Sequence, residues 1–257
     1  MTVTPANTPP AEPPEHGRRY LVAPRYLAGH GDQPEQALAP LLEAGWTPVS
    51  DIALDGLTLL SPDLNTLMRY RPEDRIFPAW TVYDFAPTRA GGPVWTATFT
   101  WDTPTEILTG FTTALARPQD TPEPPSEDPF AAFGEAGWTL HRGLLGTLYT
   151  DYRFLADAHR RHRVDEEREM AHLDETWLVT APGAHGSWFA TATRATPVRL
   201  LSALAAATLD PRPALRTSLT GVAHQAQITA LPHTRVPPKP PASNVRGHGA
   251  ARRTGRR

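Results

Sequence analysis

One short pattern occurs twice in this chain, and the duplication constrains the fold more than any other feature. Glu43-Ala44-Gly45-Trp46-Thr47 recurs as Glu135-Ala136-Gly137-Trp138-Thr139, 92 positions later. Six of the seven tryptophans fall into matched pairs: Trp46 and Trp138, Trp80 and Trp177, Trp95 and Trp188. Self-similarity at a fixed spacing indicates repeated structural units. The 257 residues therefore predict two tandem pseudo-repeats, each of about 100 residues, which is a common domain size.

Shifts in composition suggest where these units begin and end. The 29 prolines cluster in three stretches, and such stretches bury too little apolar surface to order themselves. The predicted organisation is a disordered Pro-rich N-terminus (1–17), repeat 1 (18–117), a Pro/acidic linker (118–129), repeat 2 (130–211), an extension without a clear pattern (212–231) and a disordered basic tail (232–257).

Hydrophobic periodicity predicts an α+β fold. In repeat 1 we expect strands at about 20–23, 46–52, 56–61, 64–71, 79–86 and 93–101. A first helix follows Asp32, is disturbed by Pro40 and ends at Gly45. A second begins at Thr103, where Glu106 would complete a capping box. Each repeat is then a short helix, an antiparallel sheet of about four to five strands, and a C-terminal helix packed on one face.

Several short motifs resemble a known family. They are Leu60-Ser61-Pro62-Asp63-Leu64, Ala79-Trp80-Thr81-Val82, Pro93-Val94-Trp95-Thr96-Ala97 and Thr103-Pro104-Thr105-Glu106-Ile107. The chain resembles the actinobacterial, mainly Streptomyces, domain of unknown function named for a Ser-Pro-Asp-Tyr motif, DUF317. The resemblance covers about 19–117 well and 130–211 loosely. The motif's Tyr is Leu64 here, and repeat 2 has no Ser-Pro-Asp. The resemblance supports the fold and implies no catalytic residue.

Composition restricts the compartment and the chemistry. The chain has no cysteine, which excludes disulfides and thiolate chemistry. Its apolar runs are shorter than the roughly 20 residues that a membrane-spanning helix needs. Residues 1–15 lack the basic and then apolar pattern of a signal peptide. We therefore expect a soluble cytoplasmic protein.

A histidine-rich stretch is the best candidate for a metal or catalytic site. It contains His159, His162, Glu166, Glu169 and His172, and the first two have the i, i+3 spacing of a helical ligand pair. Three neighbouring arginines oppose a divalent cation, and such charge runs usually form a solvated surface. No Gly-x-Ser-x-Gly, Gly-x-Gly-x-x-Gly or Gly-Lys-Ser/Thr pattern is present. We therefore expect no catalytic residue, no cofactor and no metal.

The alternation of side chains separates the two faces of the predicted sheet. The paired tryptophans would fill the core, as large aromatics usually do. Arg69, Arg71, Tyr83 and Phe85 would then lie on the opposite, outer face and are the candidate partner-binding residues. Sheet faces with aromatic and arginine side chains bind single strands and peptides. The competing interpretation, which the pattern slightly favours, is that the linker or the other repeat covers this face.

Two functions follow from these patterns. We favour a non-enzymatic binding protein that recognises a protein or peptide partner through a sheet face. The alternative is a single-stranded nucleic-acid-binding protein that also uses its tail. Residues up to Asp210 carry a net charge of −11, whereas the remainder carries +9. A basic tail can bind nucleic acid weakly and without sequence preference, or equally fold back on the acidic body or have no role. Its candidate contacts are Arg246, Arg252, Arg253, Arg256 and Arg257.

Overall fold

The computed structural model describes residues 18–31, 33–49, 56–71, 78–85, 92–117, 128–219 and 225–231. Three predicted segments lie wholly or mostly outside these residues: the disordered N-terminus, the linker up to residue 127 and the basic tail with its five candidate arginines. None of the described helices combines the length and the apolar character that crossing a membrane requires.

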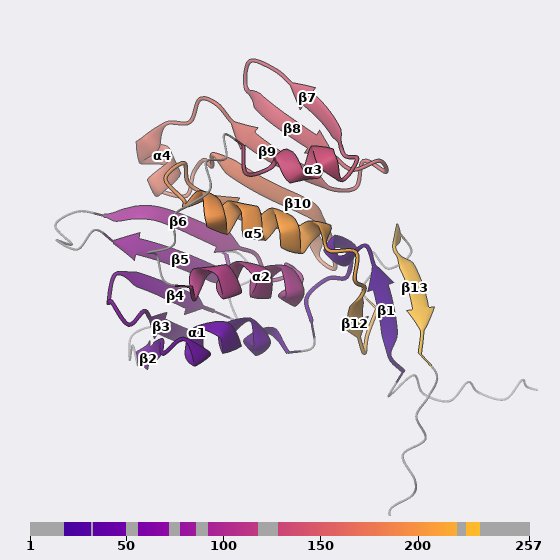
Figure 1. Ribbon diagram of the computed structural model, residues 1–257, viewed down its shortest axis with the longest axis horizontal. Coiled ribbons are helices and arrows are strands. Elements are labelled where there is room, and N and C mark those ends of the chain that lie inside the picture. Colours follow the sequence, from indigo (N-terminus) through magenta and orange to yellow (C-terminus); the bar gives the residue numbers. More distant parts are fainter. Residues whose placement is uncertain are drawn as a thin grey trace, which may run out of the picture.

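The fold is α+β, and its main layer is one antiparallel sheet of ten strands (Figure 1). The strand order is β2-β3-β4-β5-β6-β11-β10-β9-β8-β7. The bounds are β2 Thr47–Val49, β3 Leu57–Leu60, β4 Thr66–Tyr70, β5 Trp80–Phe85, β6 Pro93–Phe99, β7 Thr139–Arg142, β8 Gly146–Thr150, β9 Asp157–Arg161, β10 Trp177–Gly183 and β11 Gly186–Ala192. The predicted size of four to five strands is wrong, because β6 pairs with β11 and joins both halves into one sheet.

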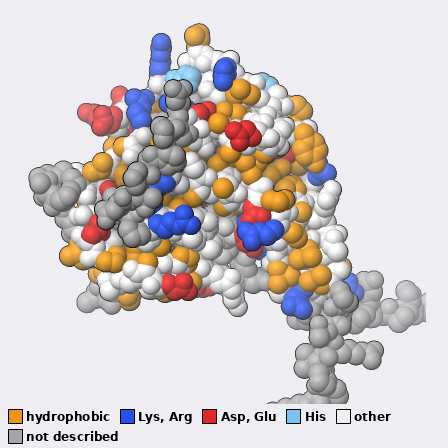
Figure 2. All heavy atoms as spheres, viewed as in Figure 1, with side chains coloured by type: hydrophobic (Ala, Val, Ile, Leu, Met, Phe, Trp, Pro, Cys, Tyr) orange, Lys and Arg blue, Asp and Glu red, His pale blue; other side chains and the backbone are white. Residues whose placement is uncertain are grey.

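Helices cover one face of this sheet (Figure 1). They are α1 Ala39–Glu43, α2 Thr105–Leu115, α3 Ala131–Glu135 and α5 Val198–Leu209. The two longer ones, α2 and α5, lie side by side and approach closely at Gly110, where a Cβ atom would lie 2.4 Å from the Cβ of Ala207. The surface on this side mixes hydrophobic, cationic and anionic side chains (Figure 2).

The helix α2 packs on one face of the sheet as predicted, and its apolar side chains Ile107, Leu108 and Phe111 are fully buried. The first helix starts late, as Pro40 indicated. A 3-10 segment over Pro34–Leu38 precedes α1, and the chain turns at Gly45 with a φ of 86°. Asp32, which the predicted helix follows, lies outside the described residues.

The tryptophans fill the space between the helices and the sheet. All six paired tryptophans are buried, which confirms the core interpretation. The indole N–H of Trp188 is fully enclosed and donates to the carbonyl oxygen of Tyr26 at 2.9 Å. The strands that carry Trp80 and Trp95 pair in the same register as those that carry Trp177 and Trp188. Two residues after each tryptophan, Val82 lies opposite Ala97 in the first half, and Val179 lies opposite Ala190 in the second.

A second, three-stranded sheet joins the two ends of the described chain. Its central strand β1 (Tyr20–Ala23) pairs with β12 (Ala214–Arg216) on one side and β13 (Gln227–Ala230) on the other. The sequence predicted β1 but placed it in repeat 1, and it assigned no structure to the two C-terminal strands.

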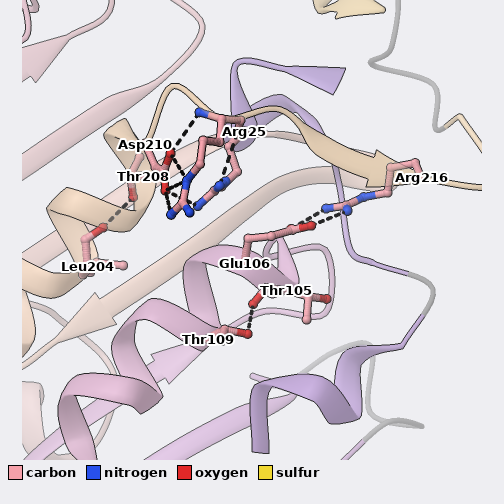
Figure 3. Close-up of polar contacts among 9 residues, drawn as sticks. Arg25, Thr105, Glu106, Thr109, Leu204, Thr208, Asp210 and Arg216 are labelled. Carbon is pink, nitrogen blue, oxygen red and sulfur yellow. Dashed lines mark hydrogen bonds and ion pairs between the residues drawn. The ribbon is translucent and has the colours of Figure 1, made fainter. Parts of the chain in front are cut away.

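Two ion pairs connect this small sheet, and the segment that follows β1, to the helices α2 and α5 (Figure 3). Arg25 meets Asp210 at 3.0 Å, and the buried guanidinium of Arg216 grips both carboxylate oxygens of Glu106 at 2.7 Å. The predicted capping box at Thr103 is therefore wrong. The N-cap of α2 is Pro104, one residue later than predicted, and it has no side-chain cap, while Glu106 is engaged by Arg216.

Candidate functional site

The outer face of the ten-stranded sheet, which the four helices leave uncovered, has a polar centre. Arg69, Thr81, Thr98 and Thr191 are successive cross-strand neighbours on β4, β5, β6 and β11. The hydroxyl groups of Thr98 and Thr191 lie 2.6 Å apart, so that a hydrogen bond spans the junction of the two halves. This row puts one guanidinium and a series of hydroxyls on a single surface.

A segment of the second half folds over part of this surface. We call residues 163–176, between β9 and β10, the α4 segment, after its helix α4 (Glu166–Met170). Asp165 caps the helix by accepting from the backbone N–H of Arg168 at 3.0 Å. The buried carboxylate of Glu169 accepts backbone N–H bonds from Thr176 and Arg194, both at 2.9 Å. The segment is therefore held at both its helix and its end.

The α4 segment also meets the outer face through an aromatic contact. His172 adopts a left-handed backbone with a φ of 57°, and its ring lies edge-on to Tyr83 with the centroids 6.0 Å apart. Burial lowers the pKa of His172 below its ordinary value. Beneath the segment Thr96 and Thr98 are only 1% and 6% exposed. The α4 segment therefore covers this side of β6 and shields its threonines from water.

The cover is incomplete and leaves a cavity of about 510 Å³, which we call the outer-face cavity. Arg69, Arg71 and Tyr83 line it, so the structure brings together three of the four predicted partner-binding residues. The fourth, Phe85, is not part of the lining but stacks against Tyr83 with the centroids 6.2 Å apart. The competing interpretation was that the linker or the other repeat covers this face. The α4 segment of the second half covers only part of it.

Sequence reasoning missed most of the remaining lining. The remaining lining residues in or next to the strands are Pro78, Ala79, Thr81, Thr96, Thr98, Thr100, Phe189, Thr191, Ala192 and Thr193, and those on the α4 segment are Glu169, Ala171, His172, Leu173, Asp174 and Glu175. Only Glu169 and His172 are singled out by the sequence, as part of the histidine-rich stretch. The alternation of threonines along β6 was visible, but it identified a face and not a cavity. No local signal showed that a charge run from the second half would close over the first.

The charges that line the cavity are unequally compensated. Asp174 and Glu175 both form ion pairs with Arg161, which meets Glu175 at 3.0 Å. Burial raises the pKa of Glu175, while the same guanidinium opposes that shift. On the opposite wall, the buried Nε of Arg69 has no hydrogen-bond partner within the described part of the chain. The acids of the cavity therefore have partners, whereas this donor of Arg69 does not.

The histidine-rich stretch does not converge on a site. His159 lies within β9, where burial and then the nearby Arg161 lower its pKa. His162 points its Nε2 at the hydroxyl of Thr147, 3.4 Å away. Glu169 is taken up by backbone N–H groups, as described above. Among the described residues, no group of three or more His, Asp or Glu side chains is arranged to hold a metal ion.

Comparison with known families places part of this site in a recognised domain. Residues 60–121 match SPDY, a domain of unknown function (DUF317). The DUF317 resemblance seen in the sequence is thereby confirmed for this stretch, while the match does not reach 130–211. The SPDY stretch holds β4, β5, β6 and α2, and with them Arg69, Arg71 and Tyr83, whereas the α4 segment lies outside it. Searches of curated proteins and of solved structures gave no match.

Proposed function

We propose that this chain is a non-enzymatic binding protein that takes a segment of a protein or peptide partner into the outer-face cavity. The observation that carries the proposal is the cavity itself, whose volume of about 510 Å³ lies in the usual range for ligand sites, roughly 300–1,000 Å³. Its lining combines an aromatic ring at Tyr83, apolar surface at Leu173 and Phe189, and convergent hydroxyl and guanidinium groups. This mixture suits a side chain and its flanking backbone.

We further propose that the chain consists of two tandem units with different tasks. The turn at Gly45 and the turn at Gly137 have nearly the same φ, 86° and 87°, and each precedes a buried tryptophan. The strands of each half run from one edge of the sheet to its centre. On this proposal, the first unit supplies the sheet side of the cavity and the second unit supplies its cover.

The alternative function, binding of single-stranded nucleic acid, has one observation in its favour. Tyr83 and Phe85 form a stacked pair, and Arg69 lies on the adjacent strand. Stacking platforms of this kind hold bases in sequence-tolerant binders. Against it, three carboxylates line the cavity and would repel a chain of phosphates. The arginines of the tail lie outside the described residues and add no geometric support.

Selection from a random 12-residue peptide library displayed on phage tests the proposal with the full chain as bait. Recovered peptides, labelled with fluorescein, are titrated by fluorescence anisotropy against wild type, Tyr83→Ala and Thr113→Ala. Thr113 is exposed on α2 and serves as the matched control. We expect Tyr83→Ala to weaken binding about tenfold or more, since aromatic anchors dominate such sites, and Thr113→Ala to leave it unchanged.

Two outcomes would contradict the proposal. One is that no peptide is enriched above an unrelated bait, and the other is that the enriched peptides bind Tyr83→Ala as well as wild type. Labelled oligo-dT of 20 nucleotides is titrated in parallel at two salt concentrations. Binding of this probe that depends on Tyr83 and weakens with salt would favour the nucleic-acid function instead.

A further inference from the structure

We propose that Arg69 anchors a carboxylate of the partner, so that the segment bound in the outer-face cavity is acidic. This inference rests on the proposed peptide-binding function and specifies the chemistry of its ligand. It concerns a single negative charge from a protein, an Asp or Glu side chain or a C-terminal carboxylate, and not a polyphosphate chain.

The first step is the position of Arg69. It belongs to the cross-strand row, with Thr81 directly opposite on β5, and its side chain forms part of the cavity wall. Its Nε is buried without a hydrogen-bond partner within the described residues. A buried donor on a charged group is costly unless it is hydrogen-bonded. Because this Nε is itself enclosed, a ligand in the cavity would meet the guanidinium of Arg69 through its Nη groups.

The second step is that the carboxylates of the cavity are otherwise engaged. Arg161 holds Asp174 and Glu175, and backbone N–H groups hold Glu169. Their positions are fixed by the fold of the α4 segment, so they are not available to neutralise Arg69. The same three carboxylates would repel a doubly charged phosphate more strongly than a singly charged group. A ligand carboxylate, with one negative charge, therefore suits the charges of this cavity best.

The third step is the match of shape. A guanidinium presents its N–H groups as a planar fork that fits the two oxygens of a carboxylate. Opposite Arg69 on β5, the hydroxyl of Thr81 can donate a further hydrogen bond, while Tyr83 and Leu173 offer apolar surface for the stem of an acidic side chain. Each group needed to hold an aspartate or glutamate is thus present in one cavity.

The test uses the library-selected peptides and changes both partners. Each Asp or Glu of a peptide is replaced by Asn or Gln, and both forms are titrated against wild type, Arg69→Gln, Arg69→Lys and Arg117→Gln. Arg117 is exposed at the end of α2, so its substitution makes the same change of charge away from the cavity. Circular dichroism checks the fold of each variant.

On wild type and Arg117→Gln, we expect the loss of one particular carboxylate to weaken binding roughly 10- to 100-fold, the usual effect of a hydrogen bond to a charged group. On Arg69→Gln, both forms of the peptide should bind equally and weakly. Arg69→Lys should fall in between, because the charge remains and the fork is lost. If Arg69→Gln does not fold, the inference is still tested by the acidic and amide peptides on wild type and by the affinity of Arg69→Lys.

Three results would overturn the inference. Selected peptides without acidic residues, equal binding of the acidic and amide forms to wild type, or binding that ignores Arg69 would each do so. In these cases binding that depends on Tyr83 would still support the proposed function. The absence of any enriched peptide would instead remove the proposed function, and the inference with it.

Discussion

The buried pair of Arg216 and Glu106 gives the sharpest test of what holds the fold together. The side chain of Arg216 is 3% exposed, and all its N–H groups have acceptors. Nε donates to Ala28, Nη1 to Leu215 and Glu106, and Nη2 to Gly29 and Glu106, at 2.7 to 3.0 Å. Replacing Glu106 by Gln keeps the size of the side chain but leaves the guanidinium buried without its counter-charge.

Breaking a buried ion pair from one side costs about 3–5 kcal/mol. Because the side chain of Glu106 is 29% exposed, water can replace part of the lost interaction, and we expect the lower end, about 3 kcal/mol. Urea titration followed by tryptophan fluorescence measures this free energy of unfolding, since six indoles are buried in the fold. Glu35→Gln, the same change at an exposed position, should stay within about 0.5 kcal/mol of wild type.

A double-mutant cycle with Arg216→Met should give a coupling free energy of at least about 1 kcal/mol, because the two side chains share their hydrogen bonds. A Glu106→Gln protein that unfolds within 1 kcal/mol of wild type, or at the same urea concentration as Glu35→Gln, would refute the reasoning. The small sheet would then be held by its strand pairing and its other contacts, among them the ion pair of Arg25 and Asp210.

Three further predictions concern stability. Burial and Arg161 lower the pKa of His159 in the folded protein, so that on acidification His159 is protonated in the unfolded chain before it is in the folded one. Its contribution to the free energy of unfolding should therefore be fully present above about pH 6.5 and be lost as the pH falls below that value. Urea titrations between pH 8 and 5 should show this, and His159→Gln should reduce the slope. Gly110→Ala should destabilise by about 1–3 kcal/mol, despite the better helix propensity of Ala, since the new methyl would meet Ala207 at 2.4 Å; a rise in thermal stability would contradict the close packing of α2 and α5. Phe154 is 77% exposed and has a left-handed backbone with a φ of 57°, a conformation that costs a non-glycine residue about 1 kcal/mol. Phe154→Gly should therefore raise the melting temperature or leave it unchanged. A clearly lower melting temperature would mean that the ring makes a stabilising contact.

What the sequence predicted well are the features that one stretch of chain decides alone. The turn at Gly45 follows from the freedom of glycine at positive φ, and the stripe from Ile107 to Phe111 follows from helical spacing. The division of the sheet into two faces follows from the alternation of side chains along each strand. This alternation places Arg69, Arg71 and Tyr83 together on the outer face. In each case the spacing of neighbouring residues is itself the physical cause.

What it did not predict depends on partners far along the chain. Glu106 has the right position for a local cap, but a buried guanidinium 110 residues away is the better partner. The residues of β12 and β13 have no strong periodicity, and they become strands because β1 presents two edges. The α4 segment has the composition of a solvated loop, but distant contacts such as those of Glu169 with the backbone and of His172 with Tyr83 fix it over the outer face.

The arrangement of β1 bears on how the protein is made by the ribosome. This strand is among the first parts of the described fold to be synthesised, yet both of its partners come from the end of that fold. Until those strands emerge, a nascent chain must keep β1 unpaired, and β6 presents an open edge until β11 arrives. Completion of the fold is therefore a late event of translation, and a protein cut short between the halves would leave the strand edges of β1 and β6 unpaired and open to aggregation.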